Sequence, residues 1–194
     1  MNRKSLLNDA LSKGALLGII MLASGIFEQS IFLHSGSIGW IVAVGIEEIV
    51  IAVVYVWLLY RYTKKAAVAV YESRPEPKYF TFGEGLLYAV SLSVLAGIIA
   101  SLGGYLYLHS VIGYNEYVAH MTQWFQAILA SAAPSAPALS RNAIAQIANT
   151  PEPSLVQTVL SGMFTYLIFG TIVGSFIARA VRRHPTMNSG ANEE

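Results

Sequence analysis

Residues 38–60, IGWIVAVGIEEIVIAVVYVWLLY, decide the fold of this 194-residue chain. The stretch carries no charge apart from two adjacent glutamates, Glu47 and Glu48, and Arg61 follows it directly. An α-helix rises about 1.5 Å per residue, so roughly 20 apolar residues cross the hydrocarbon core of a bilayer, which is about 30 Å thick. The stretch is therefore predicted to be a membrane-spanning helix.

Three further stretches have the same character, and the predicted spans are about 15–34, 38–60, 86–108 and 155–178. The first is longer than a cleavable signal segment and contains Glu28 and Gln29, so we expect it to be retained as a span. The hydrophobic share of 55%, the charged share of 12% and the mean hydropathy of +0.54 are typical of multi-pass membrane proteins. The sequence thus predicts an all-α membrane protein, a bundle of four transmembrane helices.

Basic residues predict how the spans are oriented. Eleven of the 12 Lys and Arg residues lie near the N-terminus, between the second and third spans, or after the fourth span. Only Arg141 lies between the third and fourth spans. Because positive residues beside a span stay on the cytoplasmic side, both termini are predicted to be cytoplasmic, an N-in/C-in topology. Segments 35–37 and 110–154 then lie on the outer side.

An amphipathic segment at about 115–148 is predicted on the outer side, between the third and fourth spans. Its first half places apolar side chains on one helical face, and we expect that face to contact the membrane surface or the bundle because no soluble core could bury it. A surface helix packed on its own loop is the alternative. Residues 1–184 are predicted to form a single domain, followed by a disordered cytoplasmic tail at 185–194. The interfacial face includes Tyr117, Met121, Trp124, Phe125 and Ile128.

Two local patterns predict how the helices begin and pack. Thr81 precedes Glu84 by three residues, which is the spacing of a capping box that opens the third span; the alternative is a loop Thr and an unrelated Glu. Small residues also recur at four-residue spacing, which predicts close helix packing within the chain or between copies. The pairs are Gly14 and Gly18, Gly97 and Ser101, Ala100 and Gly104, and Gly170 and Gly174.

The glutamates inside the spans are the candidate functional residues. Glu28 lies roughly 9 Å and Glu47 and Glu48 roughly 14 Å from the outer ends of their spans, at 1.5 Å per residue. No basic residue lies within a span, so some of these carboxyls are expected to be protonated at neutral pH. The short link between the first two spans places their glutamates side by side. Glu47 and Glu48 point about 100° apart on a helix, so only one of them can face a given partner.

A polar pocket that opens outward is therefore predicted in the outer half of the bundle. One interpretation is a site for a cation, a proton or a polar headgroup. The other is structural: protonated glutamates donate hydrogen bonds between helices, or residues of partner subunits satisfy them. The candidate residues are Glu28, Gln29, Glu47 or Glu48, His109 and Gln157.

Other chemistries find no support in the sequence. The chain has no cysteine, and it contains no Gly-rich phosphate loop, no Gly-x-Ser-x-Gly elbow and no His-Glu-x-x-His motif. Its four histidines are scattered, and its net charge is only +1. We therefore predict no catalytic residue, no metal, no cofactor and no nucleic-acid partner, and the chain is not expected to be an enzyme.

Three segments carry a resemblance to a known family. Residues 82–88 (FGEGLLY) open the third span, residues 114–117 (YNEY) start the outer amphipathic helix, and residues 177–183 end the fourth span. This layout resembles, over nearly the whole chain, the uncharacterised family of small bacterial four-span membrane proteins called domain of unknown function 4199. The resemblance implies a four-helix fold in the bacterial inner (cytoplasmic) membrane. It implies no catalytic residues.

These observations favour a non-catalytic accessory or scaffold protein that packs in the bilayer against itself or another membrane protein. The alternative is a small proton- or cation-coupled transporter or channel that uses Glu28 with Glu47 or Glu48. A lipid-modifying enzyme is a third hypothesis, for which no nucleophile or metal set is found. Glutamates that converge on an internal cavity would favour transport, whereas glutamates that point outward would favour a partner.

Overall fold

The computed structural model describes residues 3–34, 38–75, 79–132, 142, 144–146, 149 and 151–182. The predicted cytoplasmic tail at 185–194 lies outside these residues, as does most of the second half of the predicted outer segment. The side chain of Ile128 also lies outside the described part of the chain.

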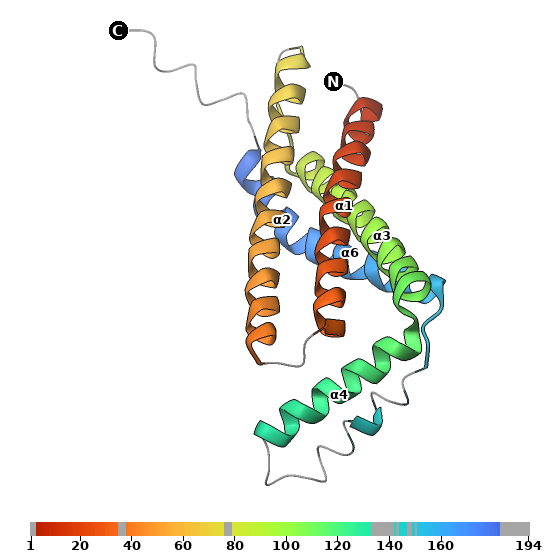
Figure 1. Cartoon of the computed structure of the whole chain (residues 1–194). Helices are drawn as coiled ribbons and strands as arrows, with labels where there is room; N and C mark the ends of the chain where they lie inside the picture. The colour runs from red at the N-terminus through yellow and green to blue at the C-terminus, as the bar shows by residue number, and fades with distance from the viewer. Residues whose placement is uncertain are drawn as a thin grey trace.

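Helices make up the described fold, and four of them form the bundle (Figure 1). Apolar stretches long enough to cross a membrane run over Ser5–Ile31, Val42–Ser73, Phe82–Ile112 and Leu155–Val181. This confirms the predicted all-α membrane fold with four spanning helices. The elements are α1 (Arg3–His34), α2 (Ile38–Ser73), α3 (Phe82–Tyr107), the π-helix η1 (Leu108–Ile112), α4 (Tyr114–Ala132) and α6 (Leu155–Val181).

The helices continue past the predicted spans at the ends that are predicted to be cytoplasmic. α1 starts at Arg3, and α2 continues without a break to Ser73. Charge density marks where an apolar span ends, but backbone hydrogen bonding continues through Lys, Ala and Glu because these residues are good helix formers. The predicted spans are therefore shorter than the helices that contain them.

Capping boxes start two of the spanning helices. The Glu84 backbone N–H donates to Thr81 Oγ1 at 3.2 Å, and the Thr81 N–H donates to Glu84 Oε2 at 2.9 Å, which confirms the predicted box. Ser154 and Gln157 form a second box at the start of α6, with distances of 3.2 Å and 3.0 Å. The Arg74 guanidinium pairs with Glu84, so the same carboxylate also joins α3 to the end of α2.

α3 is the central helix of the bundle and packs closely on both α1 and α6 (Figure 1). The close contacts occur at glycines. A Cβ at Gly18 of α1 would lie 3.0 Å from Ala96 Cα, and one at Gly97 of α3 would lie 2.9 Å from the Gly162 carbonyl oxygen of α6. Small residues therefore pack helices within the chain, as predicted, although Gly104 faces open space in the structure.

The buried core occupies one half of the bundle. It joins the first half of α1, the second half of α2, the start of α3 and the end of α6, and the opposite half, toward α4, contains fewer buried side chains. In Figure 1 the start of α1 and the ends of α2 and α6 lie at one end of the molecule and α4 lies at the other. The largest fully buried side chains are Tyr55, Tyr88, Phe80, Leu17, Leu59 and Leu92.

Cations and aromatic rings pair along the second half of α2. The Arg61 guanidinium lies 5.1 Å from the Trp57 ring, and the Lys64 ammonium lies 5.8 Å from the Tyr60 ring. Such residues are characteristic of the interface between hydrocarbon and headgroups, where the ring meets the apolar side and the charge meets the phosphates.

The predicted topology can be tested with single cysteines, because the chain has none of its own. We expect Gln126→Cys, on the exposed side of α4, to react with a membrane-impermeant thiol reagent added to intact cells. Ser73→Cys, at the end of α2, should react only after the membrane is permeabilised. Labelling of Ser73→Cys in intact cells would contradict the N-in/C-in topology.

A second prediction concerns the contact between α3 and α6. Gly97→Ala places a methyl group 2.7 Å from Tyr166 Cβ and should lower the free energy of unfolding by about 1–3 kcal/mol, the typical cost of overpacking. Gly45→Ala on α2 is the matched control, because a Cβ there meets nothing within 4 Å. Thermal unfolding in mild detergent measures both variants, and equal unfolding temperatures would refute the close α3–α6 contact.

Candidate functional site

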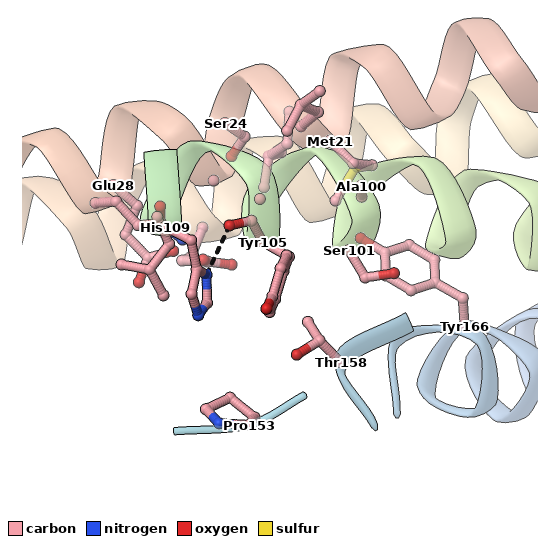
Figure 2. Close-up of a pocket in the computed structure, with 17 residues that line it drawn as sticks. Met21, Ser24, Glu28, Ala100, Ser101, Tyr105, His109, Pro153, Thr158 and Tyr166 are labelled. Carbon is pink, nitrogen blue, oxygen red and sulfur yellow. Dashed lines mark hydrogen bonds between the residues drawn. The ribbon is translucent and has the colours of Figure 1, made fainter. Parts of the chain in front are cut away.

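A cavity of about 350 Å³ lies between the four spanning helices, on the α4 side of the buried core. Figure 2 shows its lining: Met21, Ser24 and Glu28 come from α1, Tyr105 from α3, and Thr158 and Tyr166 from α6. α2 contributes Glu48 and Ile51, and the segment before α6 contributes Pro153. Every spanning helix therefore contributes to one cavity in the predicted outer half of the bundle.

Helical periodicity explains why these side chains share the cavity. On α1 the lining positions Met21, Gly25 and Glu28 follow one another at intervals of four and three residues. On α3 and η1 the lining positions Ser101, Tyr105 and His109 are spaced by four. Residues at these intervals lie on the same face of a helix, so each helix turns one continuous stripe toward the cavity.

Two of the three glutamates line the cavity. The Glu28 carboxyl lies close enough to the carboxyls of Glu48 and Glu47 for their charges to interact. Neither Lys nor Arg is among the described residues that line the cavity. The pair therefore carries negative charge that a proton or a bound cation would neutralise.

Glu47 points to a different partner. The Ser24 hydroxyl on α1 donates a hydrogen bond to Glu47 Oε1 on α2, while the other carboxyl oxygen, Oε2, is buried without a hydrogen-bond partner in the described structure. Gln29 of α1 lines the cavity, and its buried Oε1 also has no such partner. Both unpaired atoms are acceptors, so this region of the bundle has spare capacity for a donor or a cation.

His109 lies at the rim of the cavity, on the π-helix η1. Its Nδ1 is 2.8 Å from the carbonyl oxygen of Tyr105, and its ring stacks on Tyr105 with centroids 3.8 Å apart. On its other side the ring of Tyr114 is nearly parallel, at 5.9 Å. Its Nε2 lies 2.8 Å from Glu152 Oε1, which is an ion-pair distance when the ring is protonated, and it is buried without a hydrogen-bond partner among the described residues.

The structure places Gln157 away from this cavity. Its side chain accepts from the Ser154 N–H in the capping box of α6 and lines a neighbouring depression instead. Thr158, the next residue along, turns toward the cavity. The Ser-x-x-Gln spacing at 154–157 is the sequence signal that could have assigned Gln157 to the cap. No comparable signal identifies Tyr105 or Tyr166, because an aromatic residue in a span is ordinarily a packing residue.

α4 adjoins the cavity at the end of α1. It contacts α1 and η1, and Tyr117, Met121, Trp124 and Phe125 are half-buried. Burial raises the pKa of the Tyr117 phenol, and the nearby charge of Glu28 adds to this effect. The first turns of α4 therefore lie close to the carboxylates.

One comparison with known proteins finds a match. Residues 13–183 match the family described as "Protein of unknown function (DUF4199)". The chain belongs to this family. No curated protein and no solved structure shows a significant match to the chain. Family membership therefore assigns no activity to the cavity, and its chemistry has to be argued from the residues that line it.

The contact between Ser24 and Glu47 gives a test of how α1 and α2 are joined. Glu47→Gln keeps an acceptor oxygen for the Ser24 hydroxyl, so we expect nearly unchanged stability in detergent. Glu47→Leu leaves that hydroxyl without its partner and should cost about 1–3 kcal/mol of unfolding free energy. Chemical or thermal unfolding compares the two variants, and equal stability would show that this hydrogen bond contributes nothing measurable to the bundle.

Proposed function

We propose that this protein binds a cation or a proton between Glu28 and Glu48 and is a small cation- or proton-coupled membrane transporter. One observation supports the proposal most: carboxyls from two adjacent spans meet in one cavity that all four spanning helices line. Ionisable groups inside a membrane are costly, and those that face a cavity characteristically mark ion or proton pathways.

The location of the buried core bears on how such a site would work. Beyond the cavity the bundle is closed by side chains such as Tyr55, Tyr88 and Leu92, which are almost fully buried. A ligand that enters from the α4 side would therefore stop at the level of the glutamates. Passage to the opposite side requires the core half to rearrange, and this favours a transporter with alternating access over a permanently open channel.

A second candidate function is an accessory or scaffold role, and the outer surfaces of α2 and α6 favour it. Only 11% of the most apolar window of α2 and 17% of that of α6 is buried. Large apolar side chains such as Ile49 (67% exposed) and Phe176 (74% exposed) therefore face lipid, another membrane protein or a second copy. For either function we propose the bacterial inner membrane as the location. The spans are α-helices, which satisfy their backbone hydrogen bonds within each segment, as the hydrocarbon core of a bilayer requires.

Cation binding predicts a ligand-dependent gain in stability. We expect Na⁺, K⁺, Mg²⁺ or a small ammonium ion, titrated separately in mild detergent, to raise the unfolding temperature of the wild-type chain. Ligand at about 100 times its dissociation constant adds about 2.7 kcal/mol, which corresponds to roughly 5–10 °C for a chain of this size. Glu28→Gln and Glu48→Gln should abolish the gain, because each removes a carboxylate that lines the cavity.

Glu116→Gln is the matched control, since it removes the same charge from an exposed position on α4. It should retain the full gain in stability. If no cation stabilises the wild-type chain between about pH 5 and pH 8, and a Glu28→Gln, Glu48→Gln double variant fully complements a deletion strain, the transport proposal fails. The accessory function then remains.

A further inference from the structure

The rim of the cavity is formed where two segments far apart in sequence meet. η1 carries His109, and the segment before α6 carries Glu152 and Pro153; Figure 2 shows His109 and Pro153 on facing sides of the cavity. Among the described residues, two contacts that hold the segment before α6 at this place are the pair of His109 with Glu152 at 2.8 Å, and a hydrogen bond of 3.3 Å from the Tyr114 hydroxyl of α4 to the Pro151 carbonyl.

The environment of His109 determines which nitrogen gains a proton. A backbone carbonyl only accepts hydrogen bonds, so Nδ1, which lies 2.8 Å from the Tyr105 carbonyl oxygen, carries the hydrogen in the neutral ring. Nε2 is then the unprotonated nitrogen, and it is the one that lies 2.8 Å from Glu152 Oε1. A second proton on the imidazole therefore binds to Nε2, beside the Glu152 carboxylate. It replaces a contact between two hydrogen-bond acceptors with an attraction between opposite charges.

Aromatic rings and carboxyl groups surround the imidazole. The rings of Tyr105 and Tyr114 stack on it, with centroids at 3.8 Å and 5.9 Å. Glu28 from α1 and Glu48 from α2 line the same cavity and add negative charge, and neither Lys nor Arg is among its described lining residues. Imidazole changes its charge between about pH 5 and pH 8, so a physiological change in pH can operate such a contact.

The backbone at this position suits a movable contact. η1 is a π-helix, and single turns of this kind frequently occur at functional sites. Gly113, which follows it, has a φ of 90° and donates its N–H to the Leu108 carbonyl at 2.8 Å. This glycine permits the chain to turn from η1 into α4, so the long helical run that contains His109 ends at Ile112.

We propose that His109 and Glu152 form a proton-controlled latch on the cavity: protonation of Nε2 draws the segment before α6 onto η1 and narrows the opening, and deprotonation releases it. This regulation rests on the proposed function for its purpose, because it would control access of a cation to Glu28 and Glu48. The latch itself can be measured without any ligand.

The test uses the absence of native cysteine. Thr158→Cys introduces a thiol into the cavity lining, and Gln123→Cys introduces a reference thiol on the exposed side of α4. In the full-length chain in detergent, a charged, membrane-impermeant thiosulfonate is reacted with each variant at pH 5.5 and pH 7.5. Dividing the Thr158→Cys rate by the Gln123→Cys rate largely removes the intrinsic pH dependence of thiol reactivity. We expect this ratio to be about two- to fivefold lower at pH 5.5, the factor that a partly exposed ion pair produces.

Two substitutions test whether the His109–Glu152 latch causes the pH dependence of the labelling ratio. His109→Asn keeps an amide N–H for the Tyr105 carbonyl but cannot ionise, and Glu152→Gln removes the partner charge. Either change should make the labelling ratio independent of pH. A Glu28→Gln, Glu48→Gln background should leave the pH effect in place, because the latch does not need those carboxyls. A pH-independent ratio in the chain with native His109 and Glu152, or a pH effect that survives both substitutions, overturns the proposal. If the cation titration shows no gain in stability, a pH-dependent labelling ratio still supports the latch.

Discussion

The close approach of α3 to both α1 and α6 is the constraint on which the rest of the bundle depends. Lipid is as apolar as the side chains of the spans, so burial of apolar surface does little to hold membrane helices together. Packing must come from backbones that come near one another, and Gly18, Gly97 and Gly170 provide this at the two α3 contacts. With α3 held on both sides, Ser101 and Tyr105 of α3 and His109 of η1 face the cavity.

Unequal packing along the bundle creates the site. Where the helices converge, Tyr88 and Leu92 of α3 are buried in the apolar core. Toward α4 the same helices leave the cavity that Glu28 and Glu48 line. Polar groups are tolerated there because a cavity can admit water, protons or ions. The distribution of small and large residues along each helix therefore decides where polar chemistry is possible.

The sequence predicted the elements of the fold better than the geometry of the site. Apolar length and the capping box at Thr81 were sufficient to identify the four spanning helices and the start of α3, because both signals are local. The rotation of a helix about its axis is not local, so the sequence could not decide which of Glu47 and Glu48 faces Glu28. Gln157 shows the same limit: depth in the membrane suggested a pocket residue, but its backbone position makes it a capping residue.

The cation–aromatic pairs on α2 have a consequence for the bilayer itself. Pairs such as Arg61 with Trp57 and Lys64 with Tyr60 favour the headgroup level, so they would oppose sliding of the protein along the membrane normal when the bilayer thickness does not match. A change in bilayer thickness would then act mainly at the opposite end, around η1 and α4. The depth of the carboxylates below the far surface, and with it their contact with water, therefore depends on the length of the surrounding lipid chains.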